Sequence, residues 1–150
     1  MYSFESLKEG QTFSSSARTL TETDLVMFCM MMGDWHAIHA DENYAKETRI
    51  GRRMFHGTFG ISLAIAQSAD LLPLSNRIIA ALGFKDWTFK APLFIGDTVH
   101  TDVIIAGTRL ASDGRRGVLS RTIRLVKHDG TVAQEGLAEL LVELEGGKSQ

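Results

Sequence analysis

A short polar segment holds the densest group of ionisable side chains in this sequence. Asp34, His36, His39 and Asp41 lie close together in it, and His56 follows at the start of an apolar segment. A carboxylate and an imidazole such as Asp34 and His39 can hold one water molecule between them and act on it as general acid and base. We therefore treat Asp34 and His39 as candidate catalytic residues.

Three other interpretations of these residue types stay open. His36, His39 and Asp41 could hold a metal ion, although their spacing is generic and no Cys ligand or His-Glu-x-x-His helix accompanies them. Ser62 or Cys29 could act as a nucleophile, although neither lies in a Gly-x-Ser-x-Gly turn. In the third interpretation the aspartates cap turns and the histidines are ordinary surface residues.

The apolar segment after His56 is expected to form a central helix over residues 57–72 that Pro73 ends. The first N–H groups of a helix have no partner within it, and the helix dipole places partial positive charge there. Gly57 lies at this helix start, where the lack of a side chain would let a developing oxyanion approach closely. Close packing of the helix on a sheet is the alternative reason for this glycine.

The elements before this helix are expected to position the polar segment. Residues 13–20 have the pattern of a short strand. Thr21 and Asp24 form a capping box, and the apolar residues that follow are too numerous for an exposed amphipathic helix. We expect a buried helix that ends at Gly33, and then a loop over 34–55 with one short helical turn.

The second half of the sequence is rich in β-branched and aromatic residues, which is typical of strands. Asp113-Gly114 and Asp129-Gly130 are hairpin dipeptides, so the last three strands are expected to form an antiparallel meander. A buried helix across a curved antiparallel sheet is an α+β fold. The expected strands cover residues 77–82, 84–90, 97–110, 117–127 and 131–145.

Length and composition favour one globular domain over residues 1–150, with 146–150 as a flexible tail. The chain has 150 residues, of which 44% are hydrophobic and 23% are charged, and these values exclude disordered and collagen-like chains. Lys and Arg total 16 against 18 Asp and Glu, which gives a net charge of −2. This balance argues against a nucleic-acid-binding protein.

The same composition favours a cytoplasmic protein without a membrane anchor. The longest apolar run, residues 25–32, is far shorter than the roughly 20 residues that cross a bilayer. The N-terminal residues lack the basic and apolar regions of a secretory signal. The single cysteine, Cys29, cannot form an internal disulfide, which is compatible with a reducing compartment.

Three motifs resemble those of the (R)-specific enoyl-CoA hydratases, which are MaoC-like dehydratases. Residues 33–39 (GDWHAIH) are similar to the hydratase motif of that family, and His56-Gly57 to the pair that opens its central helix. Residues 91–98 (APLFIGDT) are similar to a later strand motif. The sequence departs from the family at His36-Ala37, where Asn-Pro is usual, and at Ile38, where Leu is common.

The resemblance implies a hotdog fold, in which a curved sheet wraps around a long helix, and a homodimer or a multiple of dimers. It implies reversible addition of water to a trans-2-enoyl-CoA, giving an (R)-3-hydroxyacyl-CoA. Asp34 and His39 would be catalytic, and the Gly57 N–H would stabilise the enolate. The resemblance implies no metal or redox cofactor. Coenzyme A would be part of the substrate.

Four further residues are expected to bind this acyl-CoA substrate: Trp35, His56, Arg52 and Arg53. The two arginines belong to a basic group with Lys46 and Arg49 that could meet the phosphates of coenzyme A. A partly dry pocket would raise the pKa of Asp34. A hotdog acyl-CoA thioesterase and a non-catalytic acyl-thioester-binding module remain alternative functions.

Overall fold

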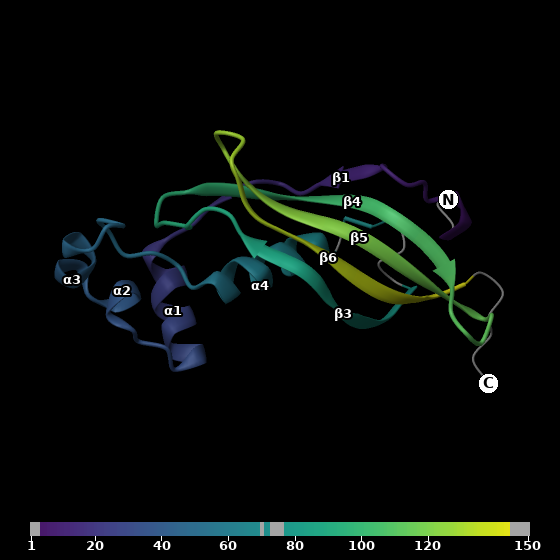
Figure 1. Cartoon of the computed structure of the whole chain (residues 1–150), viewed down its shortest axis with the longest axis horizontal. Coiled ribbons are helices and arrows are strands. Elements are labelled where there is room, and N and C mark those ends of the chain that lie inside the picture. Colours follow the sequence, from purple (N-terminus) through teal and green to yellow (C-terminus); the bar gives the residue numbers. More distant parts are fainter. Residues whose placement is uncertain (1–3, 70, 73–76, 145–150) are drawn as a thin grey trace.

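A curved antiparallel sheet packs one face against helix α4, while α1, α2 and α3 gather at one end of the molecule (Figure 1). The structure is a computed structural model that describes residues 4–69, 71–72 and 77–144. Its elements are η1 (Phe4–Ser6), β1 (Thr12–Ser14), β2 (Arg18–Thr19), α1 (Glu22–Met32), α2 (Ala37–Ala40), α3 (Glu42–Glu47), α4 (Gly57–Ser68), β3 (Ile78–Phe89), β4 (Thr98–Leu110), β5 (Arg116–Lys127) and β6 (Val132–Glu143). The expected α+β architecture is confirmed.

The strands follow one another in the order β1-β4-β5-β6-β3, with β2 also paired to β4. The two predicted hairpins join β4 to β5 and β5 to β6, so the antiparallel meander is confirmed. Gly114 and Gly130 have φ values of 65° and 86° in these turns, a conformation that glycine adopts without steric cost.

Two strand predictions were wrong in detail. One strand, β3 (Ile78–Phe89), takes the place of the two predicted over 77–82 and 84–90, because register shifts in its pairing with β6 keep Gly83 within the strand. Residues 13–20 form two short strands, β1 and β2, rather than one. Between them the Thr101 N–H donates to the hydroxyl of Ser15, so a side chain replaces the backbone partner there.

Helix α1 has the predicted ends but not the predicted burial. Thr21 and Asp24 form the capping box, and Gly33 ends the helix in the left-handed conformation with φ of 68°. Only Leu25 and Cys29 of this helix are buried, whereas four of its methionines are 55–75% exposed. The prediction of a buried helix was wrong because α1 meets the core along one side and has no described element on its outer side.

Helix α4 supplies the central helix but ends at Ser68 rather than at residue 72. Phe59, Leu63 and Ala64 on this helix are buried against the sheet and belong to the same cluster as Leu25 and Cys29 of α1. This shared cluster fixes the start of α4 relative to the end of α1, where the polar segment lies. Pro73 and the predicted tail at 146–150 lie outside the described residues.

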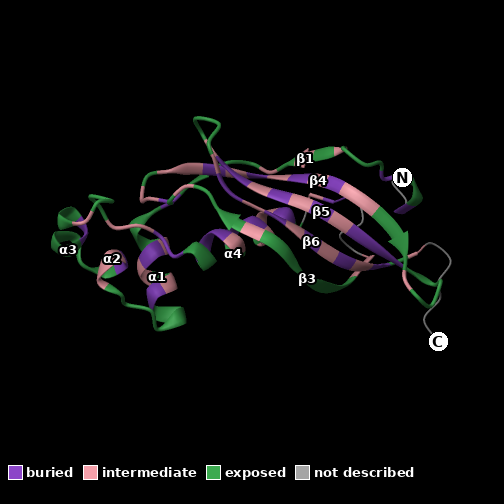
Figure 2. Cartoon of the chain, viewed as in Figure 1, coloured by how far each residue is buried: buried purple, intermediate pink, exposed green. Residues whose placement is uncertain are grey.

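Strand β3 is the exposed edge of the sheet. Among the described strands it pairs only with β6, and Figure 2 shows most of its length as exposed. Its exposed apolar side chains include Ile79, Leu82, Phe84 and Phe89. No described helix is long and apolar enough to cross a membrane.

Candidate active site

The polar segment folds into two short helices instead of a loop with one helical turn. Helix α3 corresponds to the predicted turn, and α2 was not predicted. Nδ1 of His36 accepts the Ile38 N–H at 3.2 Å and so caps α2. The Asp41 carboxylate accepts the Asn43 and Tyr44 N–H groups and caps α3. A histidine cap takes the place of the usual Asn-Pro, and nothing in the sequence pattern indicated it.

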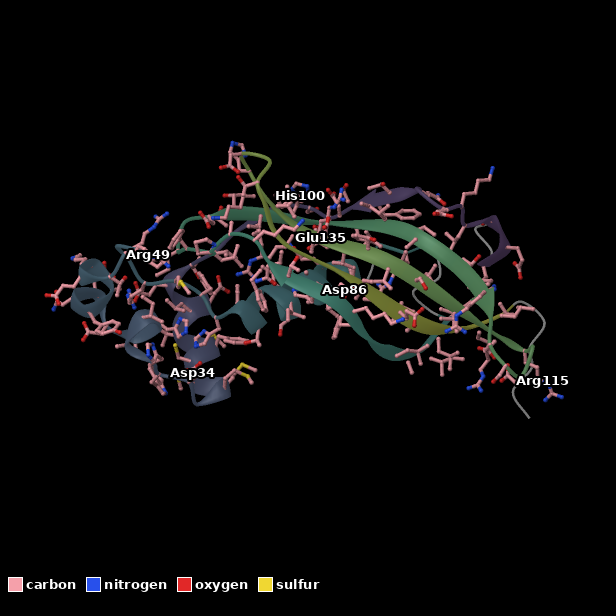
Figure 3. The ribbon with its side chains drawn as sticks, in the orientation of Figure 1. Asp34, Arg49, Asp86, His100, Arg115 and Glu135 are labelled. Atoms are coloured by element: carbon pink, nitrogen blue, oxygen red, sulfur yellow. The ribbon has the colours of Figure 1, made fainter. Side chains whose placement is uncertain are left out.

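The metal set that the sequence suggested, His36, His39 and Asp41, is not among the groups of described residues whose ligand atoms come together, and His36 and Asp41 hold helix ends. A different set of three side chains brings its ligand atoms close to one another. Asp34, His39 and His56 place one ligand or proton-transfer atom each within 4.8 Å of one another. Figure 3 shows Asp34 at the helical end of the molecule, far from Arg115 at the opposite end.

The two histidines of this trio stack face to face, with ring centroids 3.7 Å apart and planes inclined by 24°. His56 Nε2 lies 3.1 Å from the backbone oxygen of Asp34 and 3.6 Å from its carboxylate. Because a carbonyl oxygen only accepts, Nε2 of His56 carries the proton of this contact. His56 therefore orients the Asp34 residue and also supports the ring of His39.

The hydrogen bond of His39 fixes which of its nitrogens can act as a base. Nδ1 lies 2.7 Å from the backbone oxygen of Met54 and must donate to it. Nε2 then carries the lone pair. Burial lowers the pKa of His39, whose residue is only 8% exposed, and the neighbouring His56 acts in the same direction. His39 is thus neutral and basic at Nε2 near pH 7.

Asp34 has the opposite environment. Its side chain is 51% exposed, and the carboxylate accepts the His36 N–H at 3.1 Å. This backbone hydrogen bond is the main cause that lowers the pKa of Asp34. The expectation of a raised pKa was wrong, because the carboxylate faces solvent in this chain and has an N–H donor. Asp34 is therefore ionised beside a neutral His39.

Gly57 begins α4 directly after His56, and His56 makes no side-chain cap there. A Cβ atom at Gly57 would lie 2.9 Å from the ring of Phe89, which is too close for an undisturbed contact. Close packing, one of the two reasons considered for this glycine, is therefore confirmed. The exposed helix start also leaves partial positive charge beside Asp34, His39 and His56.

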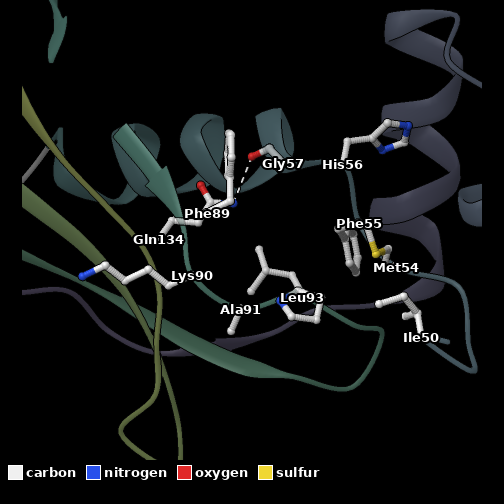
Figure 4. A pocket seen from close by; sticks show the side chains of 11 residues that line it. Ile50, Met54, Phe55, His56, Gly57, Phe89, Lys90, Ala91, Leu93 and Gln134 are labelled. Atoms are coloured by element: carbon white, nitrogen blue, oxygen red, sulfur yellow. Dashed lines mark hydrogen bonds between the residues drawn. The ribbon is translucent and has the colours of Figure 1, made fainter. Parts of the chain in front are cut away.

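A cavity of about 450 Å³ opens at this helix start (Figure 4). Its wall is mostly apolar and includes Phe55, Phe89 and Leu93, while Gly57 and His56 form the side nearest the trio. Of the residues predicted to bind substrate, only His56 lines the cavity. The exposed Trp35 lies outside it.

The predicted basic group is largely engaged with other residues. Arg53 forms ion pairs with Glu22 at 2.7 Å and Glu42 at 3.0 Å, and these pairs connect α1 to α3. The guanidinium of Arg52 lies over the ring of Phe94 at 3.7 Å and stays exposed. Arg53 thus has a structural role in this chain, and Arg52 is better placed to meet a ligand.

The nucleophile interpretation gains no support from the geometry. Cys29 is buried, and burial raises the pKa of its thiol, so the reactive thiolate is disfavoured. The Ser62 hydroxyl donates to the Thr58 carbonyl at 3.0 Å inside α4. Within the described part of the chain, neither side chain is hydrogen-bonded to a basic group.

Comparison with known proteins decides the family. Residues 4–124 match the model of the MaoC like domain. The chain belongs to the MaoC-like family. A relative of this MaoC-like chain, an (R)-specific enoyl-CoA hydratase from Rhodospirillum rubrum, is 34% identical over 97% of this chain and 95% of its own length.

Solved structures confirm the fold of this MaoC-like chain. A monoamine oxidase regulatory protein from Archaeoglobus fulgidus matches with a TM-score of 0.87 and 28% identity over 95% of both chains. A double-hotdog protein from Mycobacterium tuberculosis matches with a TM-score of 0.84 and 19% identity, over 99% of this chain and 46% of the other. The expected hotdog fold is therefore confirmed.

Proposed function

We propose that this chain catalyses the reversible addition of water to a trans-2-enoyl-CoA, giving an (R)-3-hydroxyacyl-CoA. The observation that carries the proposal is a neutral His39 with its Nε2 lone pair free, next to an ionised Asp34 and the exposed start of α4. The name of the Rhodospirillum rubrum relative, an (R)-specific enoyl-CoA hydratase, supports the same reaction.

In the proposed reaction Asp34 and His39 hold one water molecule. His39 Nε2 removes a proton as the water oxygen bonds to the β carbon, and the carboxylate of Asp34 accepts the hydrogen bond from the remaining O–H. The π electrons of the double bond move to the thioester oxygen and form an enolate. His39 then returns its proton to the α carbon, so the atoms of water are added across the double bond.

The enolate oxygen is the point at which negative charge develops. The Gly57 N–H at the start of α4 would donate to this oxygen, and the helix dipole would add to the stabilisation. The cavity beside Gly57 has an apolar wall, which suits part of an acyl thioester. His56 would position Asp34 and His39 rather than exchange protons, because it bonds to the Asp34 backbone and stacks on His39.

This reaction needs no metal or redox cofactor, since acid–base chemistry at His39 and hydrogen bonding at Gly57 supply every step. Coenzyme A is the carrier of the substrate. We place the protein in the cytoplasm, where a single buried cysteine stays reduced and acyl-CoA substrates are available.

The test is hydration of crotonyl-CoA and of longer, branched and carboxylated enoyl-CoAs, monitored as the decrease in enoyl-thioester absorbance, with enzyme assayed before and after dialysis against EDTA. We expect hydration to an (R)-alcohol at the same rate before and after chelation. Release of CoA thiol from saturated acyl-CoA would instead identify a thioesterase. Thermal stabilisation by acyl-CoA without turnover would identify a binding module.

Arg52→Ala and Arg53→Ala should separate ligand binding from stability. Arg52→Ala is expected to raise KM for the CoA substrate up to about fivefold, the effect of losing one exposed charge contact, with kcat unchanged. Arg53→Ala removes the partner of Glu22 and Glu42 and should lower Tm by about 2–4 °C. Steady-state kinetics and thermal melts measure both, and an unchanged KM in Arg52→Ala would remove this residue from the substrate site.

We also propose that two chains pair through their β3 strands to form a homodimer. The exposed backbone edge and apolar side chains of β3 support this assembly. The native chain should show twice its sequence mass by light scattering, and Leu82→Lys on β3 should convert it to a monomer. Leu110→Lys, which changes an exposed leucine at the end of β4, is the matched control. A monomeric native chain would exclude the dimer.

A further inference from the structure

A buried glutamine connects the start of α4 to the sheet. Gln134 on β6 is only 2% exposed. Its Nε2 donates to the Gly57 carbonyl at 3.0 Å (Figure 4), and its Oε1 accepts the indole N–H of Trp87 at 3.1 Å. The two bonds fix the orientation of the amide, because Trp87 can only donate and a carbonyl can only accept.

Two glycines make room for this chain of contacts. A Cβ atom at Gly60 of α4 would lie 2.0 Å from Nε2 of Gln134. A Cβ atom at Gly136 of β6 would lie 2.5 Å from the Trp87 ring and 2.9 Å from its backbone. The amide of Gln134 and the indole of Trp87 therefore occupy space that any other residue at positions 60 or 136 would fill.

A bulge in β3 brings Trp87 to this place. Three steps along β3, from Lys85 to Thr88, oppose two steps along β6, so one extra residue is accommodated there. Asp86 has φ of 51°, the only described non-glycine residue with positive φ. Such a backbone conformation is strained for a residue other than glycine and persists where the surrounding structure requires it. The bulge leaves Trp87 half-buried in a strand that is otherwise mostly exposed.

We propose that Gln134 is a positioning residue for the oxyanion site, and that Trp87 holds it in place. This inference rests on the proposed hydratase function. By binding the first carbonyl of α4, Gln134 fixes the helix start to β6 and so sets the direction of the neighbouring Gly57 N–H. It also polarises the peptide unit between Gly57 and Thr58, which strengthens the helix-start dipole facing the enolate.

The decisive variant is Gln134→Leu, which keeps the size of the side chain and removes both hydrogen bonds. We expect kcat to fall about tenfold with KM nearly unchanged, less than the 10²–10³-fold typical of losing an oxyanion donor outright. Trp87→Phe, which removes the indole N–H together with part of the ring and leaves Gln134 in place, should give a smaller fall in kcat. This second variant keeps the test available if Gln134→Leu does not fold.

The matched control is Gln67→Leu. Gln67 also joins α4 to the sheet through a half-buried amide, which accepts the Thr101 hydroxyl at 2.8 Å, but it lies at the opposite end of the helix. It should lower Tm by a similar amount and leave kcat unchanged. The amide resonance of Thr58 in an NMR spectrum should shift in Gln134→Leu and stay in place in Gln67→Leu.

The outcomes separate this inference from the function on which it rests. An active native enzyme whose kcat is unaffected by Gln134→Leu and Trp87→Phe would overturn the inference alone. Equal losses of kcat in Gln134→Leu and Gln67→Leu would also overturn it, because general destabilisation would then be the cause. A native chain that hydrates no enoyl-CoA would overturn the proposed function and, with it, the positioning role.

Discussion

Asp34→Asn and His39→Gln are each expected to lower kcat for enoyl-CoA hydration by about 10²–10⁴-fold, the range for loss of a general acid–base group. Asparagine keeps the oxygen that accepts the His36 N–H but has no charge with which to hold the water. Glutamine keeps a donor for the Met54 carbonyl but has no basic nitrogen. Single-turnover and steady-state hydration of crotonyl-CoA measure both effects.

The pH dependence of kcat in the native enzyme tests independently whether His39 acts as the base. His39 acts as a base only when neutral, so activity should be lost as the pH falls through its pKa. Burial lowers that pKa, so the acid limb should lie below the ordinary histidine value of about 6.5. The pKa of Asp34 is also lowered, so its carboxylate stays ionised across this limb. Native turnover in Asp34→Asn, with an unchanged melt, would contradict the catalytic assignment.

The second large effect is expected when the Gly57 N–H is removed. Proline is well tolerated at the first position of a helix, and His56 has φ of −59° and ψ of 142°, which suits a residue before proline. Gly57→Pro should therefore preserve α4 while removing the N–H that we propose as the donor to the enolate. Loss of one oxyanion donor predicts a fall in kcat of about 10²–10³-fold.

Any side chain at position 57 would contact the ring of Phe89, so the test needs a second substitution at position 89. Both Gly57→Pro and Gly57→Ala are therefore made together with Phe89→Ala, which opens the space. Alanine keeps the N–H and proline lacks it, so the ratio of their kcat values isolates the donor. Equal kcat in the two double variants would exclude Gly57 from the oxyanion site.

Much of the fold could be predicted because local patterns determine it. The capping box at Thr21 and Asp24, the left-handed end at Gly33 and the two Asp-Gly hairpins each depend on a few neighbouring residues. The strand from 77 to 90 was divided wrongly because Gly83 has the same local pattern in a bulge as in a turn. Only the pairing with β6 distinguishes these cases.

The proximity of Asp34 and His39 could also be predicted, since both lie within one motif. The stacking of His56 on His39 and the bond from Gln134 to Gly57 could not, because they join residues distant in sequence through the register of helix and sheet. Gly60 was the available signal for Gln134, but a glycine within a helix does not identify what lies against it. The exposure of α1 was missed for a similar reason, as apolar composition does not show which faces are covered.

The two edges of the sheet differ in a way that limits how many chains can join. At one edge β4 is flanked by β1 and β2, with three and two residues, whereas β3 presents twelve residues at the other. An antiparallel pairing of β3 with β3 is symmetric and uses the long edge of both chains at once. In the proposed dimer no comparable edge would remain among the described strands for a third chain, so pairing of β3 would stop at two chains rather than continue into a fibre.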